Sequence, residues 1–252
     1  MLLRRITQHV KDQNWFAVAL DFFIVVIGVF MGFQVQQWSE NRSEREDARQ
    51  YLQRLVIDMD VAIERNNRQA KYALEQVEKS NTVLAALDSC ELQKAEEAAF
   101  VTGLFSLGKT DMPIMVMGTI DELNSTGNFP LIGDLTLRRM VTESVRQHQT
   151  VLAIDNQIVG RTIPSINYVR SRVRFNLNKH YINADVIDPA DVVYKFEDLC
   201  ADTEFIHAIA TVREMTLANI AFNEQRRDDQ IQVKEALERE LGGPVQAREV
   251  TQ

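Results

Sequence analysis

The most apolar stretch of the chain lies near its N-terminus. Residues 16–33 read FAVALDFFIVVIGVFMGF, with Asp21 as the single charge. Trp15 and Trp38 bracket a span of about 23 residues, which makes about 34 Å of helix. That length matches the roughly 30 Å hydrocarbon core of a bilayer, with an indole ring at each interface. The pattern therefore predicts one transmembrane helix over residues 15–38, with the lipid bilayer as its surroundings.

Two other interpretations of this stretch fit less well. A buried core helix is seldom so uniformly apolar between two tryptophans. A cleavable signal peptide has a shorter apolar region, followed by small residues at the cleavage site. Here the run continues into GFQVQQWSENR (residues 32–42), which has no such site. We therefore expect an uncleaved signal anchor.

The flanking charges predict the orientation of the span. Residues 39–47, after the span, carry two arginines and four acids. The segment before the span contains one acid and three basic side chains, Arg4, Arg5 and Lys11. Because positive flanks stay in the cytoplasm, we expect residues 1–14 there and the main domain in the periplasm of a bacterial inner membrane.

One face of the span carries a possible association motif. At 100° per residue, Asp21, Gly28 and Gly32 fall within about 40° of one another. Two small residues four apart allow close approach of two helices, and a charge is costly against lipid. The face therefore favours a second copy of the chain or a partner membrane protein. In the alternative, the glycines are incidental and Asp21 is neutral or drawn toward the headgroups.

After the span, the hydrophobic pattern becomes that of an amphipathic helix. Residues 40–88 contain no glycine or proline, so the helix is expected to continue directly from the span. Its core-facing stripe includes a polar position, Asn66, where packing should be looser or specified by hydrogen bonds. The stripe is Leu52, Leu55, Met59, Ala62, Asn66, Ala73, Val77, Leu84 and Leu87.

Further helices are expected over residues 91–107, 135–160, 164–180 and 204–241, with a buried apolar connection at 112–118. Asp134 and Thr203 are the expected N-caps of two of them, and Gly242 and Gly243 end the last. The core-facing stripe of the last helix is Phe205, Ile209, Val212, Thr216, Ile220 and Asn223.

These elements predict an all-α fold. The first and last helices are both long, so we expect them to pair antiparallel as the spine of a helical bundle over residues 39–243. Residues 91–200 would cover the flank of this spine, and residues 244–252 would form a polar tail. The chain has only 10 glycines and 5 prolines, which also favours helices over many turns.

Charge and motifs exclude several classes of function. The net charge of −8 argues against nucleic-acid binding, which needs a concentrated basic face. The four histidines lack metal-ligand spacing with each other or with cysteine, and His148 is expected on the solvated surface. Phosphate-loop, zinc-protease and nucleophile-elbow motifs are missing. We therefore expect no catalytic, cofactor-binding or metal-binding residues and no enzymatic activity.

Cys90 and Cys200 are the only cysteines. One precedes and the other follows the region between the two spine helices, so an antiparallel spine brings them to the same end. In an oxidising periplasm they would form a disulfide, and in a cytosol they would be buried thiols.

Arg170 and Arg174 belong to the only basic cluster of the domain and would share one face of a helix. They form either a patch for an anion or an acidic partner, or a set of salt bridges to the acidic first and last helices.

Two stretches resemble a family of uncharacterised bacterial single-pass inner-membrane proteins. Residues 14–38 carry its N-W-x-x-V-x-x-D-F-x-I-V-x-x-G-V anchor. Residues 119–144 are similar to its internal E-L-x-x-x-G-x-x-x-L-I-x-x-x-x-L-R signature. The resemblance implies a helical extramembrane domain and supplies no activity, cofactor or catalytic residue.

Two functions fit these expectations. The first is a non-enzymatic interaction or scaffold protein with a periplasmic domain. The second is a ligand-sensing domain that signals through a second membrane protein, because the short segment before the span is too small to hold a signalling domain.

Overall fold

The computed structural model describes residues 15–109, 115–176, 178–179, 181 and 185–245. The segment 1–14, with its orienting charges, and most of the predicted tail lie outside these residues. The chain divides into two compact units, residues 1–50 and 51–252, which are described separately. The second unit therefore begins after the boundary at residue 39 that the sequence suggested.

Helix α2 extends over Trp15–Ser89. The described residues of the first unit, 15–50, all belong to it. Within the described part of the chain, this is the one helix long and apolar enough to cross a membrane. Its apolar side chains from Phe22 to Val35 are exposed in the isolated chain, as expected for a surface that lipid would cover.

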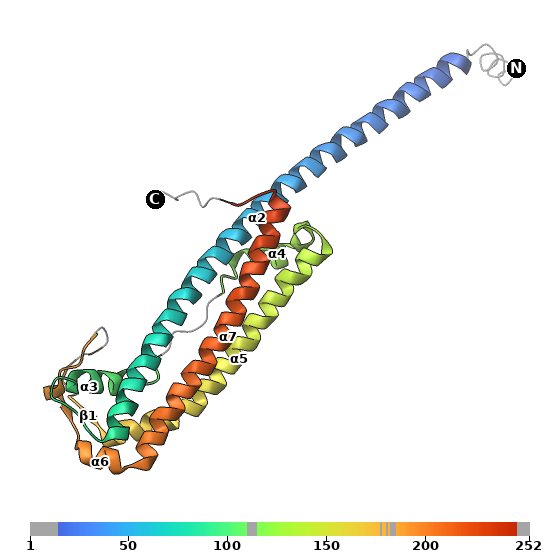
Figure 1. The fold of residues 1–252 in the computed structure, drawn as a ribbon. Helices are drawn as coiled ribbons and strands as arrows, with labels where there is room; N and C mark the ends of the chain where they lie inside the picture. The colour runs from blue at the N-terminus through green and yellow to red at the C-terminus, as the bar shows by residue number, and fades with distance from the viewer. Residues whose placement is uncertain (1–14, 110–114, 177, 180, 182–184, 246–252) are drawn as a thin grey trace, which may run out of the picture. The chain divides into compact units, whose positions relative to one another are not determined.

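Among the described residues of the second unit, three long helices lie side by side: residues 51–89 of α2, α5 (Leu135–Arg172) and α7 (Thr203–Leu241) (Figure 1). Lys234 contacts Asp60 at 2.6 Å, and Arg213 donates to Asn81 at 2.5 Å. These contacts confirm that α7 is antiparallel to α2. α5 is a third long helix of the bundle and not merely a cover on its flank.

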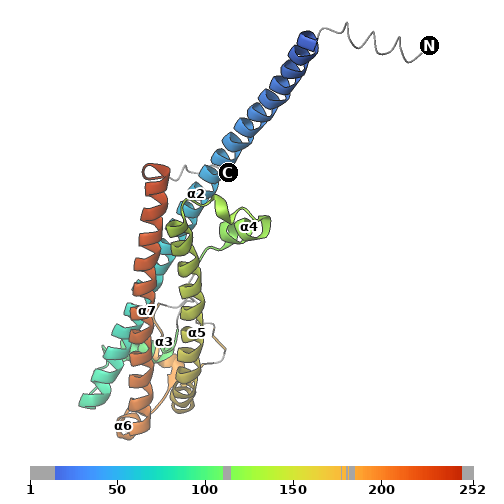
Figure 2. The same cartoon turned by 90° about the vertical axis from the view of Figure 1, so that its right-hand side faces the viewer.

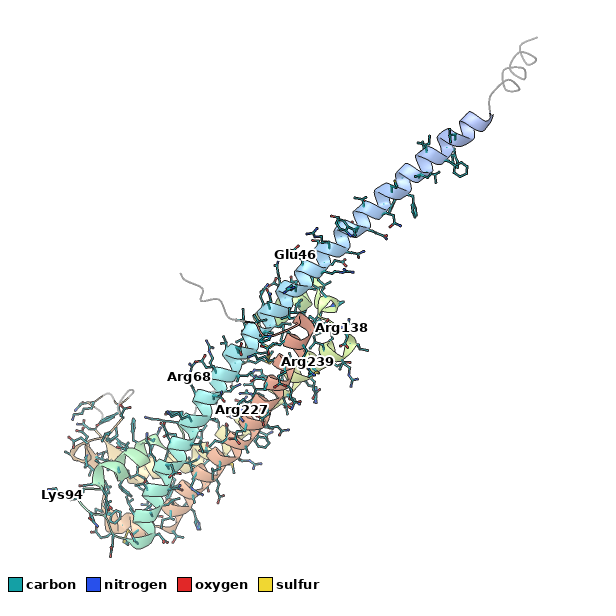
Figure 3. All side chains as sticks on the ribbon, turned by 45° about the horizontal axis from the view of Figure 1, so that its top comes forward. Glu46, Arg68, Lys94, Arg138, Arg227 and Arg239 are labelled. Atoms are coloured by element: carbon teal, nitrogen blue, oxygen red, sulfur yellow. A yellow bond between two sulfur atoms is a disulfide. The ribbon has the colours of Figure 1, made fainter. Side chains whose placement is uncertain are left out.

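Short elements lie at the two ends of this bundle. α4 and η1 adjoin the start of α5, whereas α3, α6 and a two-stranded antiparallel sheet lie near the end of α2 (Figures 1 and 2). Figure 3 shows Arg138 and Arg239 at the first end and Lys94 at the second. The short elements are α3 (Glu97–Ser106), α4 (Gly118–Thr126), η1 (Phe129–Leu131), β1 (Arg174–Phe175), η2 (Pro189–Asp191), β2 (Val192–Val193) and α6 (Phe196–Ala201).

The described residues form two large hydrophobic clusters, one toward each end of the bundle. The first packs side chains around Leu55 and Met59 of α2 against Val141 of α5 and Leu237 of α7. The second surrounds the fully buried rings of Phe100 and Phe205. Removing this apolar area from water is the main force that holds the three helices together.

Several of the predicted helix boundaries are confirmed. α2 ends at Ser89, and Cys90 follows it with a φ of 48°. The side chain of Asp134 accepts from the backbone N–H of Leu137 at 2.8 Å, as an N-cap does. α7 ends at Leu241, and its C-cap Gly242 has a φ of 84°, the left-handed conformation that favours glycine.

Other details of the prediction are wrong. Residues 135–172 form one helix, because packing on both sides of Pro164 holds α5 together despite the lost backbone donor. The N-cap of α7 is Asp202, not Thr203: its carboxylate accepts from the backbone N–H of Phe205 at 3.0 Å. α3 begins at Glu97 and not at residue 91, and α4 was not expected.

Candidate functional site

Between the two large hydrophobic clusters, the interior of the bundle holds a small apolar cluster of Ala73, Val77 and Ile220 and a group of buried polar side chains. Six side chains from the three long helices, each at most 7% exposed, form what we call the central polar layer. They are Asn66, Asp155, Asn219, Asn223, Arg226 and Gln230. Since buried polar groups are costly unless they are paired, the bonding within this layer decides whether it stabilises the bundle.

Hydrogen bonds link the layer across the helices. Asn66 on α2 donates to the Gln230 side-chain oxygen at 2.8 Å and accepts from Arg226 at 2.5 Å. Asn219 donates to the Asp155 carboxylate at 2.5 Å and accepts in turn from Asn223. The layer therefore joins α7 to both α2 and α5, and it includes one cation and one anion.

Arg226 is the most unusual residue of the layer. Burial lowers the pKa of its guanidinium to about 10, and the charge of Asp155 opposes that decrease. Arg226 therefore remains charged at neutral pH inside the bundle. One Nη atom donates to Asn66, and the other lies 3.4 Å from Nδ1 of His148.

His148 does not lie on the solvated surface, as its polar sequence neighbours suggested. It is half-buried beside Arg226, and its pKa is lowered first by burial and then by the Arg226 charge. A neutral imidazole has one nitrogen that accepts, so His148 can take a hydrogen bond from Arg226. Its helical position faces α7, which the residue types around it did not reveal.

A pocket of about 220 Å³ opens between α5 and α7, with Arg226 in its wall. Its lining combines charged, amide and apolar side chains. The lining residues are Arg146, Gln147, Thr150, Val151 and Ile154 of α5, with Phe222, Gln225, Arg226 and Asp229 of α7.

Two buried polar atoms of this lining lack a protein partner among the described residues: Nε of Arg226 and Oε1 of Gln147. Leaving such an atom unsatisfied costs about 1–3 kcal/mol, so buried polar groups usually bind water, an ion or a ligand. Asp229 is partly buried, and its pKa is raised first by burial and then by Asp228 and Glu143. The pocket thus has a buried, partly unpaired cation in its wall and an acid in its lining.

At the end of the bundle near Ser89, Cys90 and Cys200 form a disulfide, with Cα atoms 5.6 Å apart. It joins the segment after α2 to α6, which leads into α7. This placement follows from the antiparallel pairing of the two helices.

Helix α2 holds the predicted association face and interface aromatics. Around Gly28 and Gly32 there is open space, because a Cβ atom added at either would meet nothing within 4 Å. The Trp38 ring is exposed, and the Arg42 guanidinium carbon lies 5.9 Å from its centroid. The side chains of Trp15 and Asp21 lie outside what the structure describes.

The arginine cluster is not arranged as expected. α5 ends at Arg172, so Arg174 lies in β1 and shares no helix face with Arg170. Arg172 is the residue that bridges an acid, Asp202, at 2.8 Å. Neither Arg170 nor Arg174 has a salt bridge to another described residue.

Across the described residues, no group of three or more histidine, cysteine or acidic side chains has the geometry to hold a metal ion. The chemistry that the central polar layer and its pocket offer is recognition by charge and hydrogen bonding. Sequence reasoning found Asn66 and Asn223 as polar positions in core stripes. It missed Arg226 and Asp155, whose only signal was their helical spacing from apolar core positions.

Comparisons with protein-family models, with curated proteins and with solved structures gave no match to this chain. The fold and the site are therefore interpreted from their own geometry.

Proposed function

We propose that the chain is a bacterial single-pass inner-membrane protein that acts through contacts with other proteins and not through catalysis. Residues 15–38 would anchor it, with the N-terminus in the cytoplasm and the helical bundle in the periplasm. The resemblance of residues 14–38 and 119–144 to a family of such membrane proteins is consistent with this proposal.

The observation that carries the proposed location is the disulfide between Cys90 and Cys200. Structural disulfides persist in oxidising compartments and are rare in a reducing cytosol. A disulfide in the bundle therefore supports a periplasmic location, in agreement with the charges that flank the span.

The association face supports the interaction role. An acid at Asp21 in an otherwise apolar span is costly in lipid unless a protein neighbour or a polar surface receives it. The open space at Gly28 and Gly32 on the same face leaves room for a second helix. A second copy of the chain or a partner membrane protein would provide that helix.

Reporter fusions test the topology. A reporter that is active only in the periplasm, fused after Gln252, should be active, while a cytoplasm-only reporter at the same position should be silent. The reverse pattern would overturn the proposal. Purification in mild detergent followed by mass spectrometry should then recover either the chain as a homo-oligomer or a fixed membrane partner.

Ligand sensing is the second candidate, and the pocket between α5 and α7 favours it. A ligand there would contact two of the three bundle helices at once. Its binding could therefore change how α5 packs on α7, and a partner in the membrane would read that change.

A further inference from the structure

We propose that the pocket between α5 and α7 binds a free α-amino acid with an apolar side chain. Arg226 would hold the carboxylate, Asp229 the ammonium group, and Val151, Ile154 and Phe222 the side chain. This inference names the ligand of the pocket on which the ligand-sensing candidate rests. It depends on the lining of the pocket and not on the membrane topology, so it can fail while the anchor and the interaction role hold.

The opposite charges of the lining select a zwitterion. Arg226 and Asp229 are three residues apart on α7, so their side chains are neighbours on the helix surface. Both line the pocket, which therefore has a cation and an anion in its lining. A second cation of the lining, Arg146, is already paired with Glu143. A ligand with only one charge would leave either Arg226 or Asp229 without a partner of opposite charge. The head group of an amino acid carries both charges and can pair with both side chains.

Arg226 is prepared for a carboxylate by its surroundings. Asn66 and His148 each contact one Nη atom, while the buried Nε has no protein partner among the described residues. Hydrogen bonds from a guanidinium to a carboxylate are among the stronger ones in proteins. A carboxylate that reached Nε would satisfy the donor that the protein leaves unpaired.

The apolar part of the lining and the volume limit the ligand's side chain. Val151 and Ile154 come from α5, and Phe222 comes from α7. The volume of about 220 Å³ exceeds the roughly 150 Å³ of an engineered cavity in another protein that holds benzene. A branched or single-ring side chain fits this space, and leucine is the natural probe.

Isothermal titration calorimetry on the full chain in mild detergent tests the proposal with three ligands. We expect L-leucine to bind with a dissociation constant below about 1 mM. 4-Methylpentanoate, which lacks the ammonium group, and 3-methylbutylamine, which lacks the carboxylate, should each bind at least about tenfold more weakly. Undetectable binding of leucine at about 10 mM, or equal binding of the amine, would overturn the assignment.

Variants locate the binding. Asp229→Asn should weaken leucine at least about tenfold and leave 4-methylpentanoate unchanged, whereas Arg226→Gln should weaken both. Arg226 is buried, so its variant must first be shown to fold by circular dichroism. If it does not fold, Thr150→Tyr decides: it should block the pocket from an exposed position, while Gln149→Tyr on the adjacent exposed position should not. Leucine binding that survives Thr150→Tyr would overturn the site.

Discussion

Asn66 and Gln230 form a buried hydrogen bond of 2.8 Å that ties α2 to α7. Asn66 also accepts from Arg226, so one amide bonds to two side chains of α7. Since a buried polar group finds few alternative partners, a slip of one helix along the other would leave these groups unpaired. Buried polar contacts of this kind fix helix register in coiled coils, and here they would favour a single antiparallel register.

Replacing Asn66 tests the importance of this contact. Asn66→Ala leaves the side-chain oxygen of Gln230 and one Nη of Arg226 without their partner inside the bundle. We expect a loss of about 1–3 kcal/mol in the free energy of unfolding, measured by urea denaturation. Asn67→Ala removes the same side chain from an exposed position and should change stability little. Equal effects of the two variants would show that the layer does not stabilise the bundle.

The disulfide should make a large contribution to stability. Its cysteines are 110 residues apart in the sequence. The chain-entropy account gives roughly 4–5 kcal/mol for closing such a loop, a value that real disulfides often fail to reach. Adding reductant should therefore lower the melting temperature of the wild type markedly, and the double variant Cys90→Ser/Cys200→Ser should not respond to it.

Alkylation of free thiols followed by non-reducing electrophoresis checks the bridge directly. Protein taken from its native membrane should show no reactive thiol before reduction and two afterwards. Two free thiols before reduction would contradict both the bridge and the periplasmic assignment.

The environment of His148 predicts a dependence of stability on pH. Its pKa in the folded protein lies below the ordinary value of about 6.5, because burial and the Arg226 charge both oppose protonation. As the pH falls toward the ordinary value, the His148 imidazole therefore takes up a proton more readily in the unfolded chain than in the folded protein. The free energy of unfolding should therefore fall as the pH drops from about 7.5 to about 5.5.

His148→Gln should flatten this decrease, and His207→Gln, at an exposed position of α7, should leave it unchanged. Carboxylates such as Glu122 and Asp191 have lowered pKa values and lose their contribution only at more acidic pH, outside this window. Asp229 has a raised pKa and opposes the decrease, in the wild type and in the variants alike. The same pH dependence in the wild type and in His148→Gln would therefore contradict the placement of His148 beside Arg226.

The sequence predicted the architecture well, because it depends on long-range hydrophobic periodicity. Apolar residues at three- and four-residue spacings predicted α2 and α7, and the position of two cysteines predicted which ends meet. Asn66 marked a polar position within the core stripe. Of the two outcomes that the sequence left open there, looser packing or hydrogen bonds, the structure shows hydrogen bonds.

Local signals and long-range charge pairing were harder to read. The sequence predicted two helices, over residues 135–160 and 164–180, yet tertiary packing keeps α5 continuous through Pro164. Arg226, Asp155 and His148 resemble solvated residues on any helical surface. Only the packing of α5 against α7 decides that they are buried together, and no pattern within one helix contains that information. The pocket was missed for the same reason.

The association face on the span gives the last prediction. Gly28 and Gly32 are four residues apart on α2, on the same stripe as Asp21 by helical geometry. In a membrane, helices associate mainly by close packing, and a branched side chain at the interface keeps the two backbones apart.

Gly28→Ile and Gly32→Ile should therefore each weaken self-association in a membrane reporter assay. Within the single chain, a Cβ atom added at either position meets nothing within 4 Å, so we expect no clash inside the helix itself. Val29→Ile is the matched control, since it adds one methylene to a neighbouring apolar position and should leave the signal unchanged. Equal signals from all three variants would mean that the glycines are incidental. A loss with Asp21→Leu alone would assign the association to the acid and not to backbone approach.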